Sequence, residues 1–313
     1  METILMYVLF FVGIALVVKG GDVFVDAASW IARALNIPTF IIGATIVSVA
    51  TTMPEMLVSA FAAAEGKTEM AIGNAVGSVT ANVGLILAVA MIAMSISFPR
   101  KKFLPQSALM IVTAGVLLLG SLTGQLSVWA GVILAAIFIG FTTHNVLTAR
   151  REKQSDEERE PAKRKDYIKN IILFLVGAAA IVLGSQLMVN TGSEIAVSLG
   201  VPDRIIAVTL IAVGTSLPEL VTTITAIVKK ESGLSVGNII GANIIDMSLV
   251  LPICSLVSGR PIPVSPSSLT LDMPVCLGLS CLALVPILIR QKSSRLMGVL
   301  VLAGYIVYVI AVI

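Results

Sequence analysis

The sequence predicts an all-α integral membrane protein with ten transmembrane helices arranged as two inverted five-helix repeats. Three observations predict this fold: long apolar runs recur along the whole chain, basic residues gather in alternate loops, and the second half repeats the first. The 313 residues are 57% hydrophobic and only 12% charged. In a typical soluble domain about 25% of the residues are charged, so the composition excludes an ordinary soluble protein.

The apolar runs predict where the chain crosses the membrane. Each run is long enough to cross a hydrocarbon layer about 30 Å thick as a helix. The first run has no basic segment before it and no small-residue cleavage site, so we expect a retained span and not a signal peptide. The ten expected spans are residues 3–26, 38–63, 70–98, 104–122, 126–149, 168–192, 203–228, 234–257, 268–289 and 295–313.

The Lys and Arg residues predict the orientation of these spans. When the loops are numbered from the N-terminus, the odd-numbered loops hold seventeen basic residues and the even-numbered loops hold three, Lys67, Arg204 and Arg260. Cytoplasmic loops are enriched in Lys and Arg. We therefore expect a protein of the cell (plasma) membrane with the odd loops in the cytoplasm and both termini outside. The net charge of +3 is a topology signal and does not indicate a nucleic-acid partner.

The two halves of the chain align when the sequence is shifted by 164 residues. Residues 38–55, PTFIIGATIVSVATTMPE, align without a gap with residues 202–219, PDRIIAVTLIAVGTSLPE, and GNAVGSVTANVG from Gly73 aligns with GNIIGANIIDMS from Gly237. Each repeat contains an odd number of spans, so the second copy must enter the membrane from the opposite side, as in many secondary transporters. We expect a first repeat at 1–149, a hydrophilic cytoplasmic tether at 150–167 and a second repeat at 168–313.

Three carboxylates lie inside the expected spans. Glu55 and Glu219 each follow a proline, in TTMPE and TSLPE, and Asp246 lies in span eight. A carboxylate at the centre of a membrane helix costs roughly 2.5–3.5 kcal/mol on insertion scales, so its presence indicates function. Each proline lacks an N–H and frees the carbonyl four residues earlier, which here belongs to Ala50 and Gly214.

Polar residues recur on single helix faces beside these carboxylates. The residues that share a face are Ser48, Thr52 and Glu55; Ala212, Ser216 and Glu219; Asn74, Ser78 and Asn82; and Asn238, Ala242 and Asp246. Glycines such as Gly237 and Gly241 permit close helix approach next to them. An all-oxygen set is what hard cations require, and Ca²⁺ takes six to eight oxygens at about 2.3–2.6 Å. Helix kinking alone explains one such motif, but not its duplication in the same alignment around paired glutamates.

These residues carry a resemblance to a known family. With TSLPE at 215–219, its variant TTMPE at 51–55 and Gly-Asn-x-x-Gly in both halves, the whole chain resembles the cation/calcium antiporter superfamily, and within it the prokaryotic sodium/calcium exchangers. Proton/calcium exchangers of the superfamily are less similar, because they carry an acidic residue soon after Gly-Asn where this chain has Val76-Gly77 and Ile240-Gly241. The resemblance implies exchange of Na⁺ for Ca²⁺ by alternating access, with the Gly-rich spans one and six as the natural moving elements.

The resemblance also implies a ligand set. Ca²⁺ would lie between Glu55 and Glu219, assisted by the carbonyls of Thr51 and Thr215. The sodium sites would comprise Ser78, Ser216, Thr215 and the Ala212 carbonyl on one side and Thr51, Thr52, Glu219 and the Ser48 carbonyl on the other, with Asn82 and Asp246 lining the middle. Three positions depart from the family pattern: Ala242 replaces a usual serine and removes one oxygen, Ala50 replaces a glycine, and Thr52 replaces a serine.

Other functions are weighed against exchange. An H⁺-coupled or other divalent cation exchanger is the main alternative, and a cation channel is a weaker one because channels usually enclose a pore with identical subunits. An intramembrane enzyme would need a nucleophile–base pair or a metal-binding histidine cluster, and His144 is the only histidine. We expect no resident cofactor, only transported Ca²⁺ and Na⁺, and a functional monomer. We expect Asp22, Asp26 and Glu194 to be interfacial and not gating residues, and the cysteines Cys254, Cys276 and Cys281 to act as small hydrophobes.

Overall fold

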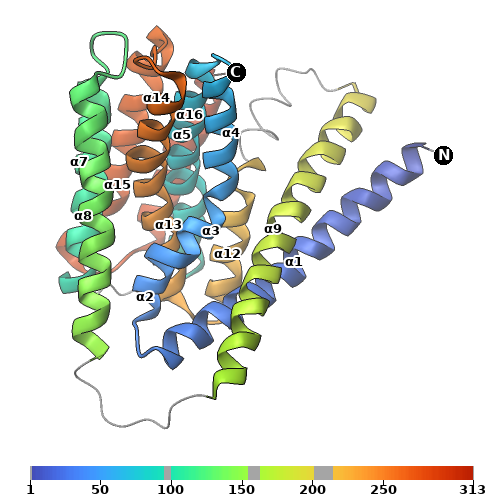
Figure 1. Ribbon diagram of the computed structural model, residues 1–313. Coiled ribbons are helices and arrows are strands. Elements are labelled where there is room, and N and C mark those ends of the chain that lie inside the picture. Colours follow the sequence, from blue (N-terminus) through green and yellow to red (C-terminus); the bar gives the residue numbers. More distant parts are fainter. Residues whose placement is uncertain (1, 95–99, 154–162, 201–213, 313) are drawn as a thin grey trace.

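The computed structural model describes residues 2–94, 100–153, 163–200 and 214–312, and this part of the chain is helical, without β-strands. Figure 1 shows most helices gathered in one bundle, with the long pair α1 and α9 slanting alongside it. The helices are α1 (Glu2–Ala34), α2 (Thr39–Ile42), α3 (Ser48–Thr51), α4 (Met53–Ala64), α5 (Thr68–Ala81), α6 (Ala88–Ala93), α7 (Arg100–Gly120), α8 (Val128–Lys153), α9 (Arg164–Ser198), α12 (Leu217–Val228), α13 (Ser232–Ile245), α14 (Leu251–Ser258), α15 (Met273–Arg290) and α16 (Arg295–Val312).

Eight of the described helical stretches are long and apolar enough to cross a membrane, and a ninth is a broken span. The broken span joins Thr39–Thr51 to Met53–Ala64 with a bend of 44°. Nine of the ten expected spans therefore have a counterpart. The expected span 203–228 lies partly outside the described residues, and its described part includes the short apolar helix α12.

Several helices are longer than the apolar runs that predicted them. Helix α1 continues to Ala34 and α9 covers Arg164–Ser198, beyond the expected spans 3–26 and 168–192. Polar residues at the end of an apolar run do not stop a helix unless the backbone is broken there, so hydropathy marks the apolar segment and not the helix end. The expected tether at 150–167 is helical up to Lys153 and again from Arg164, and residues 154–162 lie outside the described residues.

The repeat is visible in the bounds of the elements. Helices α4 and α12 begin and end 164 residues apart, and so do α5 and α13. The π-helical segments η2 (Asn82–Leu87) and η4 (Asp246–Val250) also begin 164 residues apart, while η1 (Gly43–Val47) and η5 (Ser268–Asp272) interrupt two other spans. π-Helical turns are rare and frequently occur at functional sites. At η2 and η4, equivalent sequences in the two halves therefore adopt equivalent irregular backbones.

Helices α1 and α9 pack against each other through paired glycines. A Cβ on Gly184 would lie 2.9 Å from the Gly13 carbonyl oxygen, and one on Gly20 would lie 3.1 Å from the Gly177 carbonyl oxygen. Early residues of α1 thus meet late residues of α9, so the two helices run antiparallel, as Figure 1 also shows. Gly13 and Gly177 are themselves 164 residues apart, as are Gly20 and Gly184.

Helix α13 crosses the broken span at very short range. A Cβ on Gly237 would collide with the Phe40 carbonyl oxygen, and one on Gly241 would lie 2.6 Å from Ser48 Oγ and 2.7 Å from the Ala44 carbonyl oxygen. Only glycine permits this approach of two backbones. The expected close packing at Gly237 and Gly241 is confirmed. For Gly73 and Gly77, the repeat places the equivalent partner segment at 201–213, outside the described residues.

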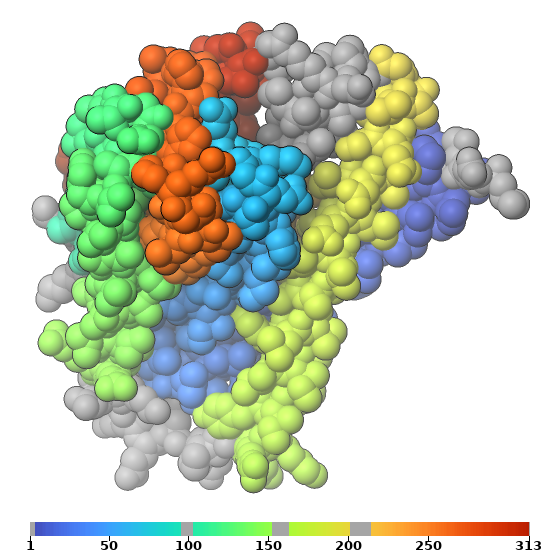
Figure 2. All heavy atoms as spheres, turned by 45° about the horizontal axis from the view of Figure 1, so that its top comes forward, coloured from blue at the N-terminus to red at the C-terminus, as the bar shows by residue number. Residues whose placement is uncertain are grey.

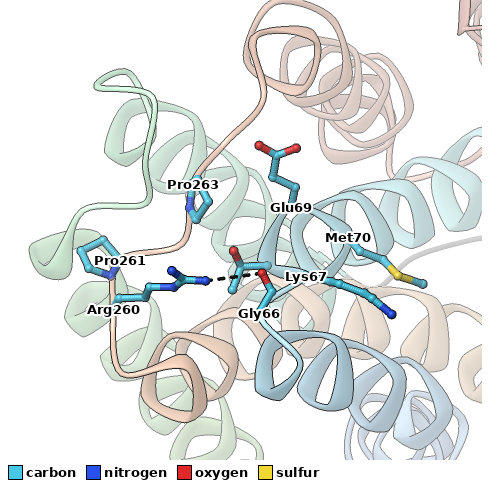
Figure 3. Close-up of a pocket in the computed structure, with 8 residues that line it drawn as sticks. Gly66, Lys67, Glu69, Met70, Arg260, Pro261 and Pro263 are labelled. Carbon is cyan, nitrogen blue, oxygen red and sulfur yellow. Dashed lines mark hydrogen bonds between the residues drawn. The ribbon is translucent and has the colours of Figure 1, made fainter.

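Two loops meet at the end of the bundle opposite the chain segment between α8 and α9 (Figure 1). The loop before α5 and the loop after α14 enclose a pocket of about 520 Å³, where Arg260 Nη2 lies 3.5 Å from the Gly66 carbonyl oxygen (Figure 3). The second loop also pairs with the loop between α7 and α8, because Leu126 N donates to the Ile262 carbonyl at 2.8 Å. These contacts join the two halves at this end.

The glycine crossing generates a prediction for stability. We expect Gly241→Ala to lower the free energy of unfolding by about 1–3 kcal/mol, the usual effect of overpacking a tight contact. The measurement is denaturant unfolding of the protein purified in detergent. The matched control is Gly131→Ala on α8, where a Cβ would meet no described atom within 4 Å. Equal stability changes in the two variants would contradict the close crossing.

Candidate cation-binding site

The three expected carboxylates lie at breaks in the helices. Glu55 is in the first turn of α4, Glu219 is in the first turn of α12, and Asp246 is the first residue of η4. Pro54 and Pro218 stand one residue before the two glutamates, at helix positions where the missing N–H leaves no hydrogen bond unmade. The free N–H groups and dipole of a helix N-terminus favour a negative charge. The local sequence therefore builds two places inside the bundle that accept a carboxylate.

All three carboxylates are removed from solvent. Glu55, Glu219 and Asp246 are each 1% exposed. The carboxylates are close enough for their charges to interact. Glu55 interacts with both Glu219 and Asp246, and Asp246 also interacts with Glu219. Buried like charges need a cation or protons close by. The charge distribution of this region is therefore suited to a positive ion.

Hydrogen bonds connect the two halves at this centre. Thr52 Oγ1 donates to Glu219 Oε1 at 3.3 Å, and Thr51 Oγ1 donates to Asn238 Oδ1 at 3.1 Å. Asn82 Nδ2 donates to Asn243 Oδ1 at 3.0 Å, which joins η2 to α13. Residues more than 160 positions apart thus hold one another in place, and the centre belongs to neither half alone.

The amide of Asn74 supports the first broken helix. Its Nδ2 donates to the Glu55 carbonyl oxygen at 3.3 Å and to Ser59 Oγ at 2.9 Å. Asn238 is the equivalent residue in the second half, and it accepts the hydrogen bond from Thr51. Sequence reasoning aligned both asparagines but did not include them among the site residues. The Gly-Asn-x-x-Gly motif carried the signal that could have included them.

Several buried oxygens at this centre have no hydrogen-bond partner in the described part of the chain. A buried polar atom without a partner costs about 1–3 kcal/mol, and more when it is charged, so a cluster of them calls for a ligand. A hard cation bound by oxygens fits this donor set. The atoms are Glu55 Oε1 and Oε2, Glu219 Oε2, Asp246 Oδ1, Asn82 Oδ1, Ser78 Oγ and Ser216 Oγ.

The carboxylates do not converge on one point. Among the described residues, no three His, Cys, Asp or Glu side chains are placed to hold one metal ion together. An ion at this centre therefore has at most two acidic ligands and takes the rest from hydroxyl, amide and carbonyl oxygens. Ca²⁺ affinity depends on the number of charged ligands, so a site with few acidic ligands binds the ion weakly enough to release it.

The other expected site residues differ in their burial and hydrogen bonding, and one of them lies outside the described residues. Ser48 is buried, its Oγ donates to the Thr45 carbonyl at 3.0 Å, and its own carbonyl already accepts from Thr52 N at 2.9 Å and Thr51 Oγ1 at 3.3 Å. Thr215 is half-buried at the break before α12. The expected carbonyl ligand of Ala212 lies outside the described residues.

The comparisons with known proteins agree with this geometry. The family model described as "Sodium/calcium exchanger protein" matches residues 5–147 and 169–313. The inner membrane protein YrbG of Escherichia coli is 33% identical over 96% of this chain and 94% of its own, and the sodium/calcium exchanger MaX1 of Methanosarcina acetivorans is 28% identical over 97% of both.

A solved structure has the same fold. The sodium-calcium exchanger NCX_Mj, in a crystal soaked with Na⁺ and no Ca²⁺, superposes with a TM-score of 0.85 at 30% sequence identity, over 99% of each chain. The agreement spans both halves. A family model that matches nearly the whole chain and a structural likeness of this extent together identify the family. The chain belongs to the sodium/calcium exchanger protein family.

Proposed function

We propose that this protein is a secondary antiporter that exchanges Na⁺ for Ca²⁺ across the membrane by alternating access. The observation that carries the proposal is the cluster of buried, unpartnered oxygens where broken helices of the two halves meet. In this proposal Ca²⁺ lies between Glu55 and Glu219, whose two negative charges balance its two positive charges. The carbonyls of Thr51 and Thr215 supply neutral ligands.

Sodium is proposed to use overlapping oxygens, so that the centre holds one set of ions or the other. The proposed sodium ligands are Ser78, Ser216, Thr215 and the Ala212 carbonyl on one side, Thr51, Thr52, Glu219 and the Ser48 carbonyl on the other, and Asn82 and Asp246 between them. Thr52 and Glu219 are already in contact, which supports their membership of one site. Competition for shared oxygens makes release of one ion a condition for binding the other, and this is the basis of exchange.

The proposed architecture is two inverted five-helix repeats at 1–149 and 168–313, joined by a cytoplasmic tether at 150–167. The antiparallel packing of α1 on its equivalent helix α9 supports inversion, because inverted repeats place equivalent helices in opposite directions. By the positive-inside rule both termini lie outside the plasma membrane. We propose that the monomer is functional, since its own two halves complete the site.

An H⁺-coupled or other divalent exchanger is the second candidate, because the same carboxylates would serve it. The Val76-Gly77 and Ile240-Gly241 positions carry no acidic residue for proton exchange. A channel is disfavoured because the three carboxylates are each only 1% exposed. The protein acts as a transporter and not as an enzyme in this proposal.

The two glutamates generate the first functional prediction. We expect Glu55→Gln or Glu219→Gln to reduce Ca²⁺ uptake into vesicles at least 100-fold, because each removes one of two charges that face the divalent ion. Loss of one partner of a buried charge pair costs about 3–5 kcal/mol. The measurement is uptake of labelled Ca²⁺ driven by an opposing Na⁺ gradient.

The matched control for the glutamates is Glu69→Gln. Glu69 is an exposed carboxylate at the pocket between the loop before α5 and the loop after α14 (Figure 3). We expect it to transport like the wild type. Thermal unfolding in detergent is measured for all three variants to check that each one is folded. Near-normal uptake by Glu55→Gln or Glu219→Gln would contradict the assigned site.

Ala242 generates a prediction about sodium. Ala242 is fully buried in α13, and its neighbour Asn243 already accepts from Asn82 and donates to Met110 Sδ at 3.7 Å. We expect Ala242→Ser to lower the half-saturating Na⁺ concentration several-fold, because one neutral hydrogen-bonding oxygen contributes about 0.5–1.5 kcal/mol. The measurement is Na⁺-dependent Ca²⁺ flux. An unchanged midpoint and steepness would show that the missing hydroxyl does not weaken a sodium site.

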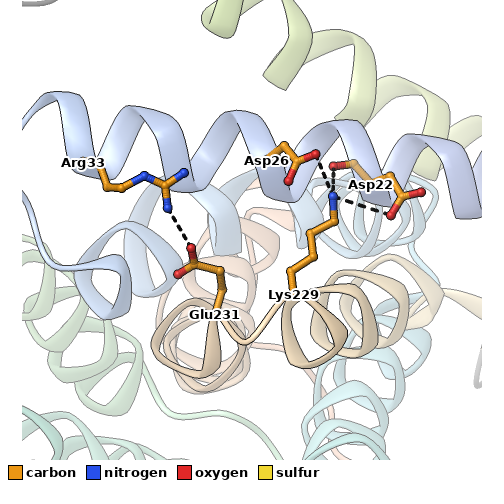
Figure 4. A network of polar contacts seen from close by, with 5 residues as sticks. All are labelled: Asp22, Asp26, Arg33, Lys229 and Glu231. Carbon is orange, nitrogen blue, oxygen red and sulfur yellow. Dashed lines mark hydrogen bonds and ion pairs between the residues drawn. The ribbon is translucent and has the colours of Figure 1, made fainter.

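An ion network ties α1 to the connection between α12 and α13 (Figure 4). Lys229 Nζ lies 2.7 Å from Asp26 Oδ2 and 3.6 Å from Asp22 Oδ1, and Arg33 Nη1 lies 2.9 Å from Glu231 Oε1. Asp22 and Asp26, expected to be interfacial residues, thus also contact the second half. In the proposed mechanism α1 moves relative to the core, so this network stabilises the position of α1 seen in this structure.

The other half has no equivalent network among the described residues. At the positions equivalent to Asp22 and Asp26, α9 carries the neutral Gln186 and Asn190. Glu65 and Lys67 are equivalent to Lys229 and Glu231 with the charges exchanged, and they pair with each other at 2.8 Å. Equivalent positions of the two halves therefore form different ion pairs.

The network generates a prediction about conformation. We expect Lys229→Gln to raise the amide hydrogen-exchange rate of residues 22–34 about three- to tenfold, because partly exposed ion pairs contribute about 0.2–1 kcal/mol each. Lys230→Gln is the matched control, since Lys230 is the adjacent exposed lysine. Equal exchange in both variants would contradict a role of the network in holding α1.

A further inference from the structure

A groove separates the broken span from the end of α8, on the same side of the protein as the tether. It has a volume of about 360 Å³. One wall is the isoleucine-rich segment 37–46, and the other is the last turns of α8, with Asn145, Val146, Ala149 and Arg150. Figure 2 shows the two segments on one face of the molecule. Ile46 and Val146 are 45% and 44% exposed at its rim, so the groove opens sideways, towards the bilayer.

Asn145 carries a donor without a partner in this groove. The residue is 0% exposed, and its Oδ1 accepts from Gln106 Nε2 at 2.5 Å. Asn145 Nδ2 has no partner in the described part of the chain. An unpaired donor at membrane depth costs several kcal/mol, so the structure calls for an acceptor oxygen in the groove.

Arg150 lies at the mouth of the groove. It is exposed, and among the described residues no acidic side chain pairs with it. Five residues along a helix correspond to about 7.5 Å, so Asn145 lies about that far deeper in the membrane than Arg150. The rest of the lining is isoleucine, valine and alanine with two threonines, Thr45 and Thr142. From the water inwards, the groove thus offers a cation, then a hydrogen-bond donor, then an apolar surface.

That order matches one class of molecule. A phospholipid presents an anionic phosphate, then ester carbonyl oxygens, then an acyl chain. We propose that the groove is a binding site for an anionic phospholipid of the leaflet on the tether side. Arg150 contacts the phosphate, Asn145 Nδ2 donates to an ester carbonyl, and the isoleucines of segment 37–46 hold an acyl chain.

The proposed lipid site is connected to the ion centre through the backbone of the broken span. Thr45 lines the groove, and its carbonyl oxygen accepts from Ser48 Oγ at 3.0 Å in the next turn. A lipid against this wall therefore contacts the half helix that carries Ser48 and Thr51. The lipid site itself rests on the membrane-spanning family fold and not on the proposed ion selectivity, so binding is measured without ions.

The test is lipid retention by the purified protein. Wild-type and variant proteins in detergent are incubated with equimolar phosphatidylglycerol and phosphatidylcholine, and the bound lipids are counted by native mass spectrometry. We expect the wild type to retain one phosphatidylglycerol at least fivefold over phosphatidylcholine. Arg150→Gln removes this preference, while Arg151→Gln, the adjacent exposed arginine outside the groove, keeps it.

A second variant tests the acyl-chain contact. Ile46→Trp fills the groove from its rim without touching the Gln106–Asn145 hydrogen bond, and we expect it to reduce retention of phosphatidylglycerol at least fivefold. The control is Ile139→Trp, at an exposed position of α8 outside the groove. Glycerol 3-phosphate, which has no acyl chain, is expected not to displace the lipid.

Three results would overturn the proposal. Equal retention of the two lipids would show that no anionic head group is recognised. An equal loss in Arg150→Gln and Arg151→Gln would indicate diffuse attraction to a basic surface. Full retention in Ile46→Trp would place the lipid elsewhere on the protein.

Discussion

The burial of Glu55 and Glu219 at the starts of broken helices is the constraint on which the rest of the structure depends. A charged carboxylate inside a bilayer needs compensation, and two backbone breaks provide part of it through free N–H groups at α4 and α12. Broken helices need neighbours that satisfy their freed backbone groups. Asn74 supports the half helix α4 that follows the first break by donating to the Glu55 carbonyl and to Ser59 Oγ. The carboxylates, the prolines and the asparagines therefore depend on one another.

The close crossing of α13 over the broken span follows from the same requirement. The Thr51 hydroxyl of the first half reaches Asn238 of α13 where the two backbones nearly touch, and Gly237 and Gly241 permit this approach. Lipid gives no hydrophobic driving force for helix association. The two halves must therefore be held together by the packing of small residues and by hydrogen bonds between the halves. The site and the contact between the halves are therefore stabilised by the same residues.

Much of the fold and the site follows from the sequence, because both depend on local patterns. The 164-residue offset predicts the equal bounds of α4 and α12 and of α5 and α13, and the Pro-Glu pairs predict where a helix breaks. The sequence did not predict the full length of α1, because a helix continues past its apolar segment. It did not predict that the Ser48 carbonyl accepts two hydrogen bonds, or that Asn145 faces a groove, because both depend on side-chain partners from distant segments.

The two halves have equivalent backbones but unequal chemistry. Ser78 has Ala242 as its equivalent, Asn82 has Asp246, and Asp26 of the ion network has Asn190. A perfectly symmetric protein would favour its two faces equally, and it would offer the ions equal ligands from each side. Because a neutral residue in one half stands opposite a charged residue in the other, the two faces are not equally favoured. For the same reason, the ions are not offered equal ligands from each side. In the proposed alternating-access mechanism, the side chains that break the repeat set the energy difference between the two facing states. The residues that keep the repeat, Pro54 and Pro218 with their glutamates, form the shared centre.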